Sequence, residues 1–142
     1  MSEQESYLIE LSDKLVPLTW QEPPPALSEP ERVFVRVWQL EAEVNNGGFA
    51  QYYFNSAGDL AAEAPAALEA IGATHTAGIV RGANAVFPAG PPREQDAREE
   101  LLDSIPAEAF APFDEGFLAY TDDLSSLLYA YVQSHREQIR GA

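Results

Sequence analysis

Apolar residues recur every three or four positions through most of the chain, the spacing that places them on one face of an α-helix. One such stripe precedes Pro17, and a longer one follows Ser28. The stripe residues of the first helix are Tyr7, Leu8, Leu11 and Leu15. Those of the second helix are Val33, Phe34, Val37, Leu40 and Val44. No stretch alternates apolar and polar residues as a half-buried strand would, so the pattern predicts an all-α protein.

A proline-rich segment and a capping motif separate the two stripes. Residues 17–26 include three consecutive prolines, which exclude regular helix and predict an extended connector. Ser28 followed by Glu31 is a capping box, in which each side chain accepts a hydrogen bond from the other residue's backbone N–H. We therefore divide the chain into an N-terminal helix with its connector, residues 1–27, and a helical domain, residues 28–142, within one globular unit.

Asn and Gly residues interrupt the pattern in the middle of the chain. Residues 45–48 (NNGG) should end the second helix, because Asn and Gly accept the left-handed conformation that a helix C-terminus needs. A short aromatic helix over residues 49–54 should follow, closed by residues 55–58. Asp59 then stands where a residue could cap the next helix.

The rest of the chain predicts further short helices separated by Gly and Pro. Their approximate ranges are 65–71, 74–87, 94–103, 110–120 and 122–139. In the helix at 94–103, Ala97, Leu101 and Leu102 should face inward. Arg136 and Arg140 should complement the C-terminal end of the last helix. We expect a single compact domain of seven or eight short helices.

Composition narrows the location and the chemistry. The 142 residues are 46% hydrophobic, enough for a core, and contain no apolar run of the about 18 residues that a membrane span requires. The first residues, MSEQESYLIE, lack the basic start of a secretion signal, so we expect a cytoplasmic protein. The absence of cysteine excludes disulfides, thiol catalysis and cysteine-bound zinc.

Charge is the most unusual property of the chain. Twenty-three Asp and Glu against eight Lys and Arg give a net charge of −15 at pH 7. Such an excess repels nucleic acid and membrane surfaces and attracts basic partners. Eight scattered basic residues form no phosphate-binding patch, so we expect no direct nucleic-acid binding. A merely solubilising acidic surface with no specific partner is the simpler interpretation of the same number.

Catalytic chemistry is not indicated by any motif. His75 and His135 have no second histidine at metal-binding spacing, and no phosphate-binding, dinucleotide-binding or nucleophile motif occurs. We therefore expect no cofactor, no metal and no enzymatic activity. Glu41 is the one anomaly, because its helical phase places a carboxylate inside an apolar stripe, where it needs a hydrogen-bond partner. A neighbouring tyrosine or the free N–H groups of the 49–54 helix could supply one.

Four acids follow helical spacing in the 94–103 segment: Asp96, Glu99, Glu100 and Asp103. Carboxylates three or four residues apart on a helix lie about 5–6 Å apart. Duplex DNA presents rows of negative phosphates, about one charge per 1.7 Å of axis over both strands. A rigid acidic helix can therefore approximate a phosphate row, although a tolerated, solvent-facing arrangement explains the same spacing.

The segment at 41–59, EAEVNNGGFAQYYFNSAGD, resembles the signature of an acidic bacterial family whose founding member is described as a DNA mimic. LEAIGA at residues 68–73 is also similar to that family, and the resemblance extends from about residue 28 onward. The positions that match the signature are Glu43, Asn45, Asn46, Gly47, Gly48, Phe49, Gln51, Tyr52, Asn55, Gly58 and Asp59.

The resemblance implies an all-helical, often dimeric fold, and for the founding member it implies binding to a DNA-binding transcription regulator in place of DNA. Its Asn, Gly and aromatic residues suit a helix-packing centre, so we interpret the signature as structural. Our leading hypothesis is a non-enzymatic interaction protein whose carboxylates occupy the basic surface of a DNA-binding protein. The alternatives are an immunity or antitoxin protein that blocks a basic nuclease, a ligand-binding or enzymatic pocket around Tyr52, Tyr53, Asn55 and Glu41, and an acidic domain without a specific partner.

Overall fold

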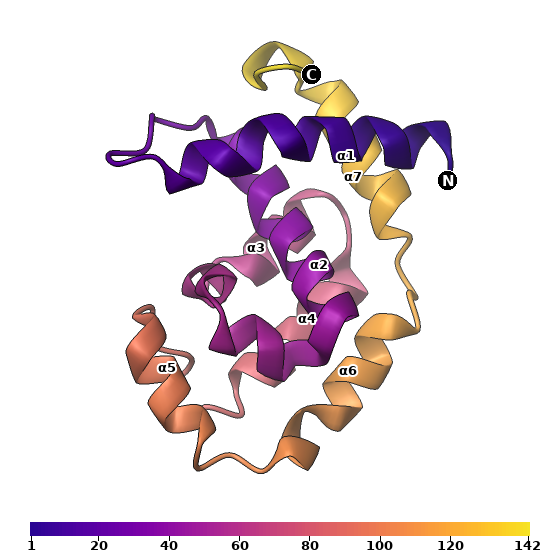
Figure 1. Ribbon diagram of the computed structural model, residues 1–142. Coiled ribbons are helices and arrows are strands. Elements are labelled where there is room, and N and C mark those ends of the chain that lie inside the picture. The colour runs from indigo at the N-terminus through magenta and orange to yellow at the C-terminus, as the bar shows by residue number, and fades with distance from the viewer.

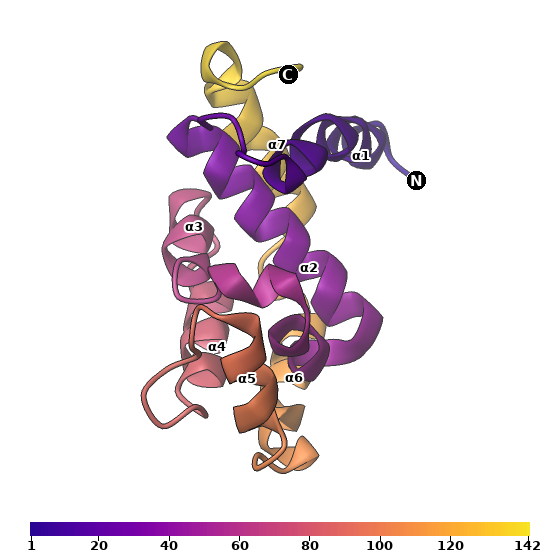
Figure 2. The ribbon, with the colours of Figure 1, turned by 60° about the vertical axis from the view of Figure 1, so that its left-hand side comes forward.

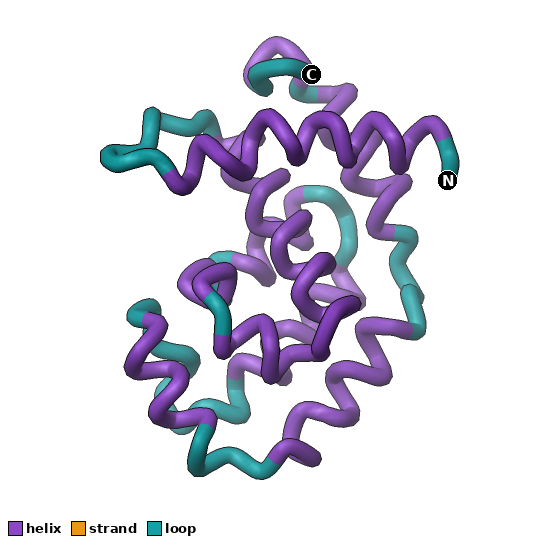
Figure 3. The backbone as a smooth tube through the Cα atoms, viewed as in Figure 1, coloured by secondary structure: helices purple, strands orange, loops and turns teal.

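The computed structural model describes residues 1–142 as one all-helical domain with no strand (Figures 1 and 3). The all-α prediction is therefore confirmed. In chain order the α-helices are α1 (Glu3–Leu15), α2 (Glu29–Phe54), α3 (Ala64–Ala70), α4 (Thr74–Asn84), α5 (Gln95–Leu102), α6 (Ala111–Leu118) and α7 (Leu124–Ser134). Short 3₁₀ turns occur at Val16–Trp20, Ser56–Leu60, Ala107–Phe110 and Arg136–Gln138.

Helix α2 forms the centre of the molecule, and every other α-helix except α4 packs against it to a substantial extent (Figures 1 and 2). The predicted stripe of α2 is confirmed, since all five of its residues are buried. Helices α3 and α4 pack as a pair on one side of α2, and α6 packs on α4. The core is a single cluster, so the domain has one hydrophobic interior rather than two.

The predicted capping box starts α2. The Glu31 N–H donates to Ser28 Oγ at 3.2 Å, and the Ser28 N–H donates to Glu31 Oε1 at 2.8 Å. Glu31 is itself buried and also pairs with Arg140, whose Nε lies 2.9 Å from Glu31 Oε2. The prediction that Arg140 complements the end of the last helix is thus wrong, because α7 ends at Ser134 and Arg140 reaches the start of α2 instead.

Helix α1 belongs to the same core as the rest of the domain. Leu8, Leu11 and Leu15 are buried, and α1 packs across α7 and α2 at one end of the molecule (Figure 1). As expected, the α-helical part of this segment ends before Pro17, although the chain continues as a 3₁₀ turn. None of the helices is both long and apolar enough to cross a membrane.

Candidate functional site

The signature segment breaks α2 and restarts it. Gly48 has φ +75° and ψ −175°, a backbone conformation that essentially only glycine adopts because a Cβ atom would clash. The helix resumes at Phe49. The Phe49 N–H, freed by the break, donates to Asp114 Oδ1 of α6 at 2.7 Å. The predicted interruption at residues 45–48 is therefore confirmed as a sharp kink, and a carboxylate from a distant helix caps the second half of α2.

Glu43 joins the two halves of α2 across this break. Its Oε2 accepts hydrogen bonds from Gln51 Nε2 at 3.0 Å and from Asn55 Nδ2 at 2.9 Å. On the other side, Asn45 Nδ2 donates to the Glu41 carbonyl oxygen at 2.8 Å and contacts Tyr120 Oη at 2.6 Å. The polar side chains of the signature therefore bond mainly to one another and to the backbone, which holds the angle between the two halves.

A buried arginine fixes the end of α2. Arg98 of α5 is 0% exposed, and its Nη2 lies 2.8 Å from Asp59 Oδ1. Its guanidinium also donates to four backbone carbonyls, those of Tyr53, Asn55, Pro92 and Arg93. A Cβ at Gly58 would lie 2.9 Å from Arg98 Nε and 2.6 Å from the Tyr52 carbonyl oxygen, so glycine is needed for this approach. The prediction that Asp59 caps a helix is wrong, because its carboxylate pairs with Arg98.

The remaining signature residues have packing roles or face solvent. Phe49 and Tyr52 are fully buried, and the Phe49 ring meets Phe117 edge-on with centroids 5.8 Å apart. Asn46 is exposed. The signature as a whole thus builds the kink of α2 and its contacts to α5 and α6.

Replacing Gly48 with alanine should lower the free energy of unfolding by about 3–4 kcal/mol, through backbone strain and loss of the Asp114 cap. The added Cβ would lie 2.8 Å from Asp114 Oδ2. Gly90 is a matched control, because it has φ +78° but an added Cβ there would meet no atom within 4 Å. Gly90→Ala should cost only about 1–2 kcal/mol. Urea denaturation of both variants checks this, and equal losses would contradict it.

The predicted ligand pocket around Tyr52, Tyr53, Asn55 and Glu41 is not formed. Tyr52 and Tyr53 are both 0% exposed, and the Tyr53 hydroxyl donates to Asn84 Oδ1 at 2.6 Å. Asn55 is engaged by Glu43, as described above. Glu41 instead lines a hollow between α1 and α2 to which none of the other three residues contributes, so the four side chains do not converge on one cavity.

Glu41 accepts a hydrogen bond from a tyrosine, which is one of the two donors that the sequence predicted for it. Tyr120 Oη donates to Glu41 Oε2 at 2.9 Å, whereas the free N–H of Phe49 is taken by Asp114. Burial raises the pKa of the Glu41 carboxyl, and the charges of Asp123 and Glu5 raise it further against the lowering effect of the Tyr120 hydrogen bond. Burial also raises the pKa of Tyr120 to about 12, so its hydroxyl stays protonated and donates at neutral pH.

Replacing Glu41 with glutamine should stabilise the protein at neutral pH. A carboxyl whose pKa is raised by folding stabilises the folded state when it is protonated. That stabilisation is lost as the pH rises from the pKa of the unfolded chain through the higher pKa of the folded protein. Glutamine stays neutral and can still accept the Tyr120 hydroxyl. Thermal unfolding should therefore show a higher Tm for Glu41→Gln at pH 7 and no difference below pH about 4. A lower Tm at pH 7 would contradict this.

The predicted acidic stripe lies on α5 and at its C-terminal end. Asp96, Glu100 and Asp103 are exposed, and Glu99 is half-buried with its Oε2 3.2 Å from Gln95 Nε2. Leu101 and Leu102 pack against the core only in part, and the fully buried residue of this helix is Arg98. None of the four acids belongs to an ion pair with a Lys or Arg side chain.

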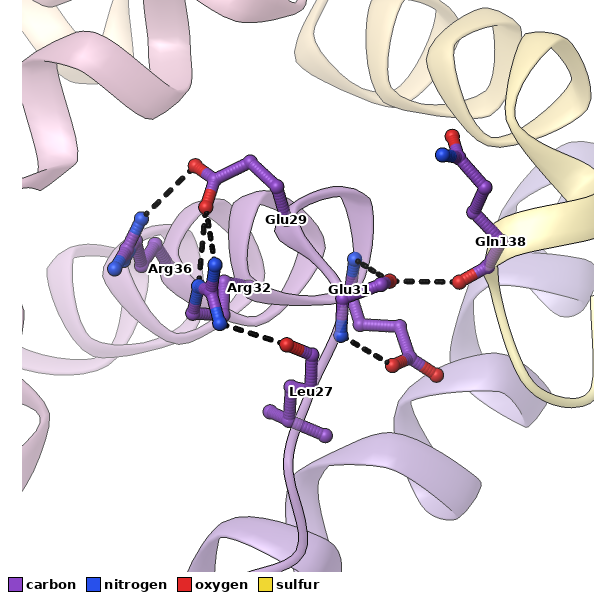
Figure 4. A network of polar contacts seen from close by, with 7 residues as sticks. Leu27, Glu29, Glu31, Arg32, Arg36 and Gln138 are labelled. Carbon is purple, nitrogen blue, oxygen red and sulfur yellow. Dashed lines mark hydrogen bonds and ion pairs between the residues drawn. The ribbon is translucent and has the colours of Figure 1, made fainter.

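The arginines pair with acids elsewhere. Around the start of α2, Glu29 lies between Arg32 and Arg36, at 2.8 and 3.5 Å (Figure 4). The other ion pairs are Arg81–Glu69, Arg93–Glu63, Arg98–Asp59 and Arg140–Glu31. Six of the eight basic residues thus engage only five of the 23 acids. The acidic face of α5, defined as Asp96, Glu99, Glu100 and Asp103, therefore has no ion-pair partner.

The two histidines occupy unrelated positions. His75 is exposed in the first turn of α4. His135 stacks on Tyr131 with ring centroids 4.1 Å apart, and its Nδ1 lies 2.8 Å from the Tyr131 carbonyl oxygen. No group of three or more His, Asp or Glu side chains is arranged to hold a metal ion.

Comparison with known proteins gives one match. A family model described as DMP19-like protein matches residues 25–135, which include the signature segment, the break in α2 and the acidic face of α5. No curated protein and no solved structure matches the chain significantly.

Proposed function

Because the chain belongs to the DMP19-like protein family, we propose that it is a non-enzymatic acidic protein that occupies the basic surface of a DNA-binding protein in place of DNA. The observation that supports this most is the unpaired acidic face of α5. Its carboxylates have helical spacing and no ion-pair partner, while six basic side chains pair with acids at other positions.

The rigidity of α5 supports the same proposal. Arg98 lies within the helix that presents the acids, and its contacts to four carbonyls and Asp59 tie that helix to the end of α2. Carboxylates held on a fixed helix can match a basic surface without the entropy loss that a flexible acidic tail would incur. A purely solubilising surface has no such requirement for order.

The test is competition with DNA. A tagged copy of the protein should recover a basic DNA-binding protein from a lysate of the source cells, and duplex DNA should then displace it from the purified complex. Affinity should fall by at least about tenfold between roughly 50 and 200 mM salt, because the contacts are electrostatic. A ternary complex with DNA, or affinity indifferent to salt, would overturn the proposal. Recovery of a basic nuclease would favour the immunity-type alternative.

A further inference from the structure

A hollow between α1 and α2 lies apart from the acidic face of α5, which carries the function proposed above. Its volume is about 250 Å³, less than the roughly 300–1,000 Å³ of typical small-molecule sites. Its apolar wall includes Leu8 and Ile9 of α1 and Trp38 of α2, where α1 crosses over α2 (Figure 1). We call it the Glu41 hollow, because the Glu41 carboxylate contributes to its lining.

Both charged side chains that line the Glu41 hollow are acidic, and its neutral polar residues are Asn45 and Ser125. Glu5 and Glu41 contribute carboxylates, and no Lys or Arg lines the hollow. Glu41 Oε2 accepts the Tyr120 hydroxyl, which leaves Oε1 free to accept a further donor. Asp123, at the start of α7, adds to the negative field at this carboxyl. Glu41 is thus a partly buried carboxylate, facing other acids, that lacks a cationic partner.

Shape and charge together fit a long basic side chain. Such a side chain packs its aliphatic stem against apolar walls and carries its charge at the tip. A purely apolar occupant would leave Glu41 without a cation, and a small inorganic cation would leave the apolar walls empty. The indole of Trp38 favours arginine over lysine, because a planar guanidinium stacks on aromatic faces.

We propose that the Glu41 hollow receives an arginine side chain of the basic partner, so that this protein has an anchoring site in addition to its acidic helix. The inference rests on the proposed function for the class of partner. Anchors of this kind, an arginine enclosed in a mostly apolar hollow, often dominate the affinity of an interface.

A second hollow extends the same groove. Trp38 and Ala42 line both hollows, and the second one, of about 500 Å³, also includes Asp13 and Trp20. Trp20 is 69% exposed, which is unusual for so large an aromatic side chain without a partner. The groove along α1 and α2 can therefore accommodate residues that flank the arginine on the partner chain.

A capped peptide tests the site without the natural partner. The full-length protein is titrated with acetyl-Ala-Arg-Ala-amide, and with the same peptide containing citrulline, which has the same shape but no charge. Chemical shifts of the Trp38 indole N–H and the Ala42 amide are followed by NMR. The arginine peptide should shift both signals saturably, and the citrulline peptide should bind at least about tenfold more weakly. Equal binding of both peptides, or no shift at Trp38, would overturn the inference.

Two variants and one control assign the binding to the hollow. Glu41→Gln should weaken binding of the arginine peptide by about tenfold or more through loss of the charge. Ala42→Leu narrows the hollow from an exposed position without changing any charge, and it should weaken binding to a similar extent. Glu10→Gln removes one exposed α1 carboxylate that lines neither hollow, so it should change binding less than about twofold.

The outcomes separate this inference from the proposed function. If DNA still competes for the protein's partner while Glu41→Gln and Ala42→Leu bind that partner normally, the anchoring site is wrong and the proposed function stands. If the arginine peptide binds and no DNA-binding partner competes with DNA, the hollow is real and the proposed function is wrong. If the Trp38 signal shifts with protein concentration alone, a second copy of this chain fills the hollow, and the inference fails.

Discussion

Replacing Arg98 with methionine should lower the free energy of unfolding by about 3–5 kcal/mol or prevent folding, because it removes a fully buried cation from its partners. Methionine replaces the unbranched aliphatic stem of arginine, so the main loss is the set of polar contacts that the guanidinium makes. Four backbone carbonyls would lose their donor, and Asp59 would lose its ion pair. Urea denaturation followed by circular dichroism measures the change.

Arg93→Met is the matched control for this experiment. Arg93 lies five residues before Arg98 in the chain, and its exposed side chain pairs with Glu63. Because ion pairs in water contribute at most about 1 kcal/mol, this variant should remain close to the wild-type stability. Arg98→Lys should fall between the two, since a single ammonium cannot reach all the carbonyls that a guanidinium does. A stable Arg98→Met variant would show that the guanidinium does not hold α5 to α2.

Local features of the fold could be predicted from the sequence because they depend on neighbouring residues. The stripe of α2, the capping box of Ser28 and Glu31, and the break at residues 45–48 each follow from residue type and spacing over a few positions. The same reasoning predicted that Glu41 accepts a hydrogen bond, either from a tyrosine or from the free N–H groups of the 49–54 helix, and the first option is the one observed. It could not identify Tyr120, which lies 79 residues further along the chain.

Long-range polar contacts could not be predicted, and they determine how the signature segment works. Asp114 caps the restarted helix from 65 residues away, and no local pattern links these two positions. The sequence gives one weak indication that Arg98 is buried. It precedes Leu101 and Leu102 by three and four residues and therefore lies on the same inward-facing side of the helix. The residue type itself predicts an exposed side chain, because a cation is buried only where it has hydrogen-bond partners. Here those partners are backbone carbonyls that come together only in the folded protein.

The acidic face of α5 illustrates the same limit for the candidate site. Helical spacing predicted that its four carboxylates lie along one helix. Whether an arginine neutralises them depends on the tertiary positions of eight basic residues, and six of those pair with acids on other elements. Which acids stay without an ion-pair partner is therefore a property of the fold, and the four on α5 belong to the helix that Arg98 ties to α2.

Reversing two charges on α5, with Glu99→Lys and Glu100→Lys together, should weaken binding to the DNA-binding partner by roughly 100-fold at low salt. Each reversal removes an attraction and adds a repulsion, and two such changes amount to about 3 kcal/mol. Both residues lie in the last turn of α5, which contains no basic residue. Lysine there complements the helix dipole and relieves repulsion among the acids, so the helix should keep or slightly gain stability.

The control for this double variant is Glu10→Lys with Glu137→Lys. It changes the net charge by the same amount, at exposed positions on α1 and near the C-terminus, and neither carboxylate belongs to an ion pair. If net charge alone attracts the partner, both double variants should lose affinity equally, and α5 would have no special role. If α5 forms the interface, calorimetric titration should show a much larger loss of affinity for the α5 variant than for the control. Raising the salt concentration should reduce the difference in affinity between the two variants, because screening weakens both attraction and repulsion. Equal losses at every salt concentration would reject an ordered acidic face and leave only a general acidic surface.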